Sequence, residues 1–479
     1  MSMLVDPRQA ERFRFVRCGY DEGVAELVYA FDQGPELVER VRFPDAPALP
    51  DERRPAFDAA LRLLHRVAGV SYYKAGIPPA VEVEGGALDA ATADLLDTLY
   101  RHGLAEFAYR NGIDLDGRIA FPRSAPPVHD LPASSSRRRP GSSDFAVPGT
   151  GPIPGQDCEA ATLDLPRRTL VPIGGGKDSL VVVEALKSIG ADATAAWVGA
   201  SPLIATVAAR TGLPTLNIGR ELSPVLFDYN RLGAWNGHVP VTAINSAILA
   251  CAAVLYGFDS IAFANERSAS AATLEYAGRQ VNHQWSKGRD FEIAFAAYLR
   301  SHVAPGLDYF SLLRPFSELA VTRAFAKCGA DYFDIFSSCN RNFRILGPKP
   351  ADRWCGQCPK CHFVFLALAP FLPKPRLLSV FGRNLLDDEA QAGGFDALIE
   401  YRDHKPFECV GEAAEARAAF AALAVRPEWR EDALIARFRE DILPQLDAST
   451  LGLEPWLKPA GGHQVPARFS EALDAVRGA

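Results

Sequence analysis

The chain has 479 residues, enough for about two to four domains, and its 48% content of apolar residues is typical of a globular protein. Its formal net charge of −7 gives no general reason to bind nucleic acid, and its one dense basic run, residues 137–139, lies in a Ser/Pro-rich stretch. The N-terminus lacks the apolar core of a signal peptide. We therefore expect a cytoplasmic protein that binds neither nucleic acid nor membrane.

The first 125 residues predict a small α+β module. Strand-like runs at 13–17, 25–31 and 36–43 are separated by turn residues and predict an antiparallel meander. Apolar residues at helical spacing follow, over 57–68 and 95–103. Residues 126–165 are rich in Pro, Ser and Gly and predict a flexible linker.

Residues 166–370 predict an α/β domain with a doubly wound parallel sheet, because strands and helices alternate. The uncharged stretch 239–258 is interpreted as a buried helix, since polar residues recur in it and a strand follows directly. Residues 371–479 predict a mostly helical region with an alanine-rich segment at 413–424. The expected strands are 168–173, 193–198, 214–218 and 260–264, and the expected helices are 179–189, 201–211 and 241–257.

The most informative segment is 170–179, an apolar strand that leads into three glycines, a lysine, an aspartate and a serine. Glycines allow close approach to phosphate oxygens, and the amides of the next helix add positive potential. A Walker A motif is excluded because Asp178 stands where its hydroxyl residue belongs. Gly174–Ser179 instead resembles the PP-loop, usually S-G-G-x-D-S, of ATP pyrophosphatases, with Gly174 replacing the first serine. The resemblance implies cleavage of ATP between the α and β phosphates; a glycine-rich turn without nucleotide is the alternative.

Four cysteines form a second motif, with Cys339 followed by a C-x2-C-x2-C run at Cys355, Cys358 and Cys361. Cysteines separated by two residues can direct their thiolates at one ion, and four thiolates complete a tetrahedral zinc site. An iron–sulfur cluster or unliganded buried cysteines are the alternatives. The pattern resembles the zinc site of 7-cyano-7-deazaguanine synthases, which implies a structural site. Such a site would hold a loop carrying Arg341, Arg344 and Arg353 near the substrate.

Three polar segments, 235–238, 265–270 and 281–288, follow elements of the predicted sheet. Loops at the carboxyl edge of a parallel sheet usually carry the substrate contacts. Helix capping and solvation of loops are the alternative for any single residue. As a set, these segments favour a binding site.

Together these motifs closely resemble the MurL family of UDP-N-acetyl-α-D-muramoyl-L-alanyl-L-glutamate epimerases, along nearly the whole chain. The resemblance implies ATP- and Mg²⁺-dependent inversion of the terminal L-glutamate of UDP-MurNAc-L-Ala-L-Glu in peptidoglycan synthesis, with release of AMP and pyrophosphate. Adenylation would make the α-proton removable, because the enolate of a mixed anhydride carries one negative charge instead of two. The segments that carry the resemblance are 174–179, 234–238, 265–270, 281–288, 336–343, 354–363 and 403–409.

Residue roles follow from this resemblance and from residue chemistry. Inversion needs a proton removed from one face and returned to the other, and His283 and Lys287 are the first candidates, with His238 and Glu266 next. The triphosphate is assigned to Gly174, Gly175, Gly176, Lys177 and Ser179, with Asp178 placing Mg²⁺. The substrate's diphosphate and carboxylates are assigned to Arg267, Arg279, Lys287 and Arg289, with Asn265 and Arg341 as further contacts.

Three other functions are weighed. A nucleobase-modifying enzyme that resembles 7-cyano-7-deazaguanine synthase would explain the cysteines, but such chains are shorter. A tRNA thiolase is disfavoured by the acidic charge balance. A non-catalytic nucleotide- and zinc-binding module gains no support from Lys177 and Asp178. The sequence does not define the oligomeric state.

Overall fold

A computed structural model of the chain describes residues 6–124, 163–276, 278–343 and 348–478. The basic run 137–139, Arg344 and all but the last three residues of the predicted linker 126–165 lie outside these ranges.

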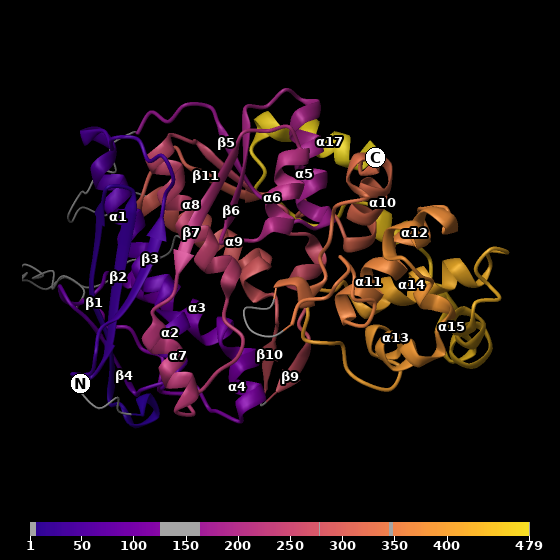
Figure 1. The fold of residues 1–479 in the computed structure, drawn as a ribbon, viewed down its shortest axis with the longest axis horizontal. Coiled ribbons are helices and arrows are strands. Elements are labelled where there is room, and N and C mark those ends of the chain that lie inside the picture. The colour runs from indigo at the N-terminus through magenta and orange to yellow at the C-terminus, as the bar shows by residue number, and fades with distance from the viewer. Residues whose placement is uncertain (1–5, 125–162, 277, 344–347, 479) are drawn as a thin grey trace, which may run out of the picture.

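The described strands form a nine-stranded sheet in the order β11-β8-β5-β6-β7-β3-β2-β1-β4, and a separate hairpin (Figure 1). The first five strands of this order are mutually parallel, which confirms the predicted parallel sheet. From β5 the chain builds outward through β6 and β7, then returns to the other side of β5 to add β8 and β11. These strands are β5 (Thr169–Pro172), β6 (Ala193–Val198), β7 (Thr215–Glu221), β8 (Ser260–Phe263) and β11 (Asp308–Ser311).

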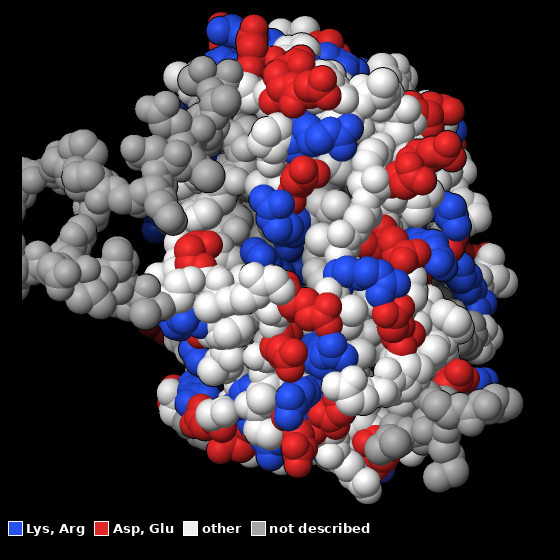
Figure 2. Space-filling model, turned by 90° about the vertical axis from the view of Figure 1, so that its left-hand side faces the viewer, with Lys and Arg blue, Asp and Glu red and all other residues white. Residues whose placement is uncertain are grey.

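The N-terminal meander is confirmed, and it extends this same sheet. Its strands β1 (Arg12–Asp21), β2 (Val24–Phe31) and β3 (Leu37–Arg42) pair antiparallel, and β4 (Ala80–Val83) runs parallel to β1. β3 pairs antiparallel with β7, so the N-terminal strands continue the parallel part without a break. Acidic and basic side chains are interspersed on the face that Figure 2 shows, and many of them form ion pairs across β1, β2 and β3.

Helices cover both faces of the sheet. Successive side chains of β6 point to opposite faces of the sheet, and both faces are apolar. Ala196 belongs to the core on one face, and Ala195 and Trp197 belong to the core on the other, so both faces need a covering layer. One face carries α1 (Arg54–Ala68), α3 (Ala90–Gly103), α8 (Val241–Tyr256) and α9 (Arg289–His302). The other carries α5 (Lys177–Ser188), α6 (Pro202–Arg210), α10 (Glu318–Cys328) and α17 (Ser470–Gly478).

The C-terminal part is mostly helical, as predicted, and its last helix, α17, returns to pack on α5 (Figure 1). The alanine-rich segment forms α14 (Ala413–Ala424), which begins with a capping box between Glu412 and Glu415. No helix of the described ranges has both the length and the apolarity that a membrane crossing requires, and 239–258 forms the buried α8. The remaining C-terminal helices are α11 (Pro359–Leu368), α12 (Lys374–Phe381), α13 (Ala392–Leu398), α15 (Ala433–Arg437) and α16 (Glu454–Leu457).

Short elements lie between the N-terminal strands and the C-terminal helices (Figure 1). The hairpin strands lie close to α4 in this region (Figure 1). These elements are α2 (Val70–Tyr73), α4 (Ala105–Asn111), α7 (Pro224–Arg231), β9 (Leu274–Tyr276) and β10 (Arg279–Val281).

Candidate active site

The glycine-rich loop joins β5 to α5, as the sequence predicts. Gly175 has φ of +80°, and a Cβ there would lie 2.6 Å from Cδ2 of Leu203, so this position requires glycine. Its carbonyl accepts a hydrogen bond from the backbone N–H of Ser337 at 2.9 Å. No heavy atom of the described residues lies within 4 Å of a Cβ placed on Gly174, so the backbone there leaves room for a side chain. The glycine that replaces the usual serine therefore opens space beside the loop.

A cavity of about 320 Å³ lies beside this loop, at the carboxyl ends of β5, β6 and β8. The direction in which the chain builds the sheet reverses between β5 and β8, and ligands of such sheets bind at this reversal. The cavity therefore has the position expected for a nucleotide site. Its polar lining includes Asp178, Ser179, Thr242, Asn245, Asn265, Lys287, Ser338, Asn340, Lys360 and Cys409.

Lys177 does not line this cavity. Its side chain is only 1% exposed, and its ammonium contacts the carboxylates of Asp178 and Glu318. Burial alone would lower the pKa of Lys177, but these two carboxylates raise it above its usual range, so the lysine stays charged. Among the described residues, the cations that line the cavity are Lys287 and Lys360. Sequence reasoning did not single out Lys360, whose position depends on the fold of the cysteine loop.

Glu266 is buried and directly follows Asn265, a residue of the cavity wall. Burial and the nearby carboxylates of Glu318 and Asp178 raise the pKa of Glu266 to about 7. A carboxyl group with this pKa exchanges its proton readily near neutral pH. Its neighbour Asn265 reaches the cavity wall itself.

His283 and His238 lie together, with ring centroids 4.4 Å apart, and both face Glu106 of α4. Burial and the neighbouring His283 lower the pKa of His238 to about 4. Burial also opposes the charge on His283, but Cys409 and Glu106 raise its pKa to about 9. At neutral pH one imidazole is therefore neutral and the other charged.

These three residues also place a carboxylate oxygen and two ring nitrogens within 4.8 Å of one another. Nδ1 of His283 is in direct contact with Oε2 of Glu106. We therefore interpret the group as a hydrogen-bonded cluster. No sequence motif pointed to Glu106, which lies 177 positions from His283.

Cys409 joins this cluster to the cavity. Nζ of Lys287 donates a hydrogen bond to its Sγ at 3.3 Å, and its carbonyl accepts one from Lys360. Burial would raise the pKa of the Cys409 thiol, but Lys287, His283 and Lys360 lower it to about 5. Sequence reasoning assigned no role to Cys409, which was only the last residue of the segment 403–409 that contributes to the family resemblance.

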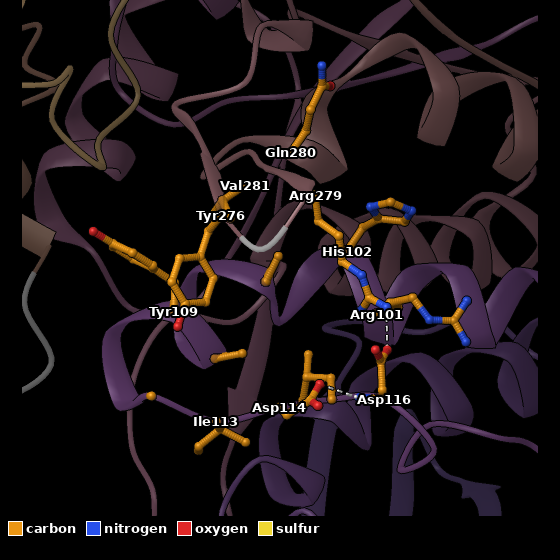
Figure 3. Close-up of a pocket in the computed structure, with 14 residues that line it drawn as sticks. Arg101, His102, Tyr109, Ile113, Asp114, Asp116, Tyr276, Arg279, Gln280 and Val281 are labelled. Carbon is orange, nitrogen blue, oxygen red and sulfur yellow. Dashed lines mark hydrogen bonds and ion pairs between the residues drawn. The ribbon is translucent and has the colours of Figure 1, made fainter.

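A larger cavity, of about 920 Å³, lies between α4 with its following loop and the hairpin strand β10 (Figure 3). Tyr109 and Tyr276 pack edge to face at one side, and Arg279 pairs with Asp116 at the other. Glu106 lies between the wall residues Ala105 and Ala108 of α4, and His283 follows the wall residue Val281 by two positions. Polar contacts lead from Glu106 through His283 and Cys409 to Lys287, which lines the smaller cavity.

Three predicted substrate contacts lie outside both cavities. Arg267 has its guanidinium 6.0 Å from the ring of Trp456. Arg289 is exposed at the start of α9, near Gly462. Arg341 donates to Oε1 of Gln357 at 2.9 Å. Arg353, which was expected only on the loop held by the cysteines, donates to the backbone carbonyls of Phe333 and Phe336.

The four predicted cysteines converge. Their Sγ atoms lie within 4.8 Å of one another, with pairs at 3.5, 3.7 and 3.9 Å. A zinc ion bound to four sulfurs at about 2.3 Å has sulfur–sulfur separations of about 3.8 Å, which matches this spacing. His362 is not part of the group, because its Nε2 pairs with Gln391 at 2.8 Å and its ring stacks on Phe395.

The cysteine loop is tied to the glycine loop. Ser337, two residues before Cys339, bonds Gly175, and Ser338 lies against Gly176. Lys360, between Cys358 and Cys361, faces the cavity. The loop held by the cysteines therefore supplies part of the cavity wall.

Known proteins match the chain over nearly its whole length. Residues 4–312 match the family model of the MurL N-terminal domain, and residues 335–451 match that of the MurL C-terminal domain. The chain belongs to the MurL family. A UDP-N-acetyl-alpha-D-muramoyl-L-alanyl-L-glutamate epimerase of Xanthomonas oryzae pv. oryzae is 55% identical over 98% of both chains. One of Salinispora tropica is 39% identical over 98% of this chain and 97% of its own.

Membership of the MurL family makes this chain an isomerase, as predicted, because its relatives are epimerases. The match to the MurL N-terminal domain includes the N-terminal strands and α4. Helix α4 supplies Glu106 and one wall of the larger cavity.

Proposed function

We propose that the protein catalyses ATP-dependent epimerisation of the terminal L-glutamate of UDP-MurNAc-L-Ala-L-Glu to D-glutamate, through an acyl-adenylate. The relatives are named for epimerisation of this substrate, which supports the substrate assignment. The observation that carries the ATP assignment is the position of the glycine loop, at the reversal point of a parallel sheet and beside a cavity with two lysines.

The chemistry explains why ATP is useful here. Removing an α-proton next to a free carboxylate would place two negative charges on a few atoms, whereas the adenylate gives a singly charged enolate. Lys287 and Lys360 would balance charge on the phosphates and on the enolate. Asp178 faces the cavity and carries an oxygen of the kind Mg²⁺ prefers, so it fits the role of a magnesium ligand. When bound, Mg²⁺ would neutralise phosphate charge.

The larger cavity is suited to the remote part of the substrate. Its volume of about 920 Å³ is in the range of sites for large ligands. Tyr109 and Tyr276 offer aromatic faces to a nucleotide base, and Arg279 offers a cation to its diphosphate. A substrate held there would extend its glutamyl end past Glu106 and His283 toward the smaller cavity. In this scheme the four predicted proton-transfer candidates, His283, Lys287, His238 and Glu266, all lie close to the reacting end.

We further propose that the four cysteines bind one zinc ion with a structural role. Their sulfur separations fit a single tetrahedral ion, whereas a multi-iron cluster would hold its cysteines farther apart. The ion would hold the loop that supplies Ser338 and Lys360 to the cavity wall.

The function is tested by incubating the full chain with ATP, Mg²⁺ and UDP-MurNAc-L-Ala-L-Glu, then hydrolysing the product and separating the glutamate enantiomers. We expect D-glutamate to form together with AMP and pyrophosphate. D-glutamate that forms equally well without ATP would disprove the adenylate mechanism, and absence of D-glutamate would disprove the substrate assignment.

A further inference from the structure

Cys409 is surrounded by positive charge at the wall of the smaller cavity. Lys287 donates directly to its sulfur, Lys360 donates to its carbonyl, and the charged His283 interacts with its thiol. A thiolate is stabilised by adjacent cations, and this environment is the kind in which reactive cysteines occur. Cys409 lines the cavity beside the glycine loop, as does Lys287, whose ammonium contacts the sulfur, so the sulfur lies close to the space for a ligand.

Asn265 is a second polar residue of this cavity, and only 7% of its surface is exposed. Its backbone N–H donates to Oγ of Ser311, whereas within the described ranges its side-chain amide forms no hydrogen bond to the protein. This amide is therefore free to bind a polar ligand in the cavity. Cys409 and Asn265 are thus placed to contact the same bound molecule.

We propose that Cys409, as its thiolate, is the base that removes the α-proton of the terminal glutamate; this assignment rests on the proposed epimerisation through an acyl-adenylate. His283 and Lys287 are then positioning residues that hold the sulfur in its charged form, and Glu106 in turn fixes His283. This explains why a charged histidine lies beside Cys409 although it is not part of the cavity wall.

The proton transfer balances without a further reagent. The sulfur lone pair takes the α-proton, and the C–H electron pair moves to the acyl oxygen to give an enolate and a neutral thiol. The enolate then takes a proton on its opposite face from water in the cavity, and the thiol returns its proton to the resulting hydroxide. Hydrolysis or reversal of the adenylate releases the inverted glutamate.

The test compares Cys409→Ala and Cys409→Ser with the unaltered protein in D₂O. We expect both variants to keep substrate-dependent ATP–pyrophosphate exchange, which reports adenylation. We expect deuterium incorporation at the glutamate α-carbon to fall by at least about 100-fold, the usual contribution of a general base. Cys328→Ala is the matched control, since Cys328 is also half-buried but lies at the end of α10, and it should leave both rates unchanged.

The outcomes separate this proposal from the proposed function. Unaltered protein that shows no pyrophosphate exchange would overturn the adenylate itself. Normal exchange with undiminished deuterium incorporation in Cys409→Ala would overturn only the role of Cys409. Should the variants fail to fold, alkylation of the unaltered protein with iodoacetamide decides: Cys409 labelled without loss of deuterium incorporation would also overturn its role.

Discussion

His65 of α1 shows how burial fixes the charge state of a single side chain. Its ring is 6% exposed, and its Nε2 lies 3.0 Å from the carbonyl of Val28. Burial lowers the pKa of His65 to about 4. Because this pKa is below that of an unfolded histidine, the unfolded chain takes up the proton first. The neutral form therefore stabilises the fold fully above about pH 6.5 and loses that contribution as the pH falls toward 4.

We expect His65→Gln to remove this pH-dependent contribution. Between pH 7 and pH 4 the free energy of unfolding should fall by about 3 kcal/mol more in the unaltered protein than in the variant, since each pKa unit corresponds to about 1.4 kcal/mol. Urea unfolding at several pH values measures this difference. His463 is exposed, so the substitution His463→Gln serves as the control. Parallel pH profiles for the unaltered protein and His65→Gln would contradict a pH-dependent contribution of His65.

At the scale of elements, the cysteine loop joins the start of α11 to the glycine loop. Cys358 is the residue before the first turn of α11, and Cys339 follows the serines that contact Gly175 and Gly176. A metal ion bound by both segments would fix their separation. Loss of this metal ion should therefore weaken nucleotide binding and also lower the free energy of unfolding of the protein.

We expect Cys358→Ser to lose about one equivalent of zinc per chain and to destabilise the protein by roughly 3 kcal/mol or more, because loss of a bound metal is among the large effects of single substitutions. Elemental analysis and calorimetry measure the two effects. Cys328→Ser, outside the cluster, should change neither. Purified protein that contains iron, or no metal, would refute the zinc proposal.

At the scale of the whole molecule, an ion pair connects the N-terminal strands to the parallel part of the sheet. Glu39 of β3 is fully buried, and Arg220 of β7, 14% exposed, donates to it at 2.8 Å and to Ser71 at 3.1 Å. On the same two strands Arg42 pairs with Glu221, but these side chains are 50% and 56% exposed. The two pairs allow a matched comparison across one junction.

We expect Arg220→Ala to lower the free energy of unfolding by about 3 to 5 kcal/mol, because it leaves the Glu39 carboxylate buried without a partner. Arg42→Ala should cost no more than about 1 kcal/mol, since the exposed pair is screened by solvent. Urea denaturation of both variants gives the comparison. Equal losses would show that the buried pair does not hold the junction.

Local sequence determined most of the elements. β6 has the predicted bounds, and the strands and helices around it differ from the prediction by at most a few residues, because apolar periodicity and glycine positions are properties of contiguous residues. The glycine loop and the four-cysteine cluster were predictable for the same reason: short spacings carry their geometry.

The tertiary structure decided what no contiguous segment encodes. Pairing of β3 with β7 merged the N-terminal strands with the parallel sheet, and Glu106, Lys360 and Cys409 met His283 and Lys287 across large distances in the chain. It also turned Lys177 away from the cavity, toward Glu318. Residue types and spacings specify which chemistry is available, whereas burial and charge partners, which only packing defines, specify which side chains perform it.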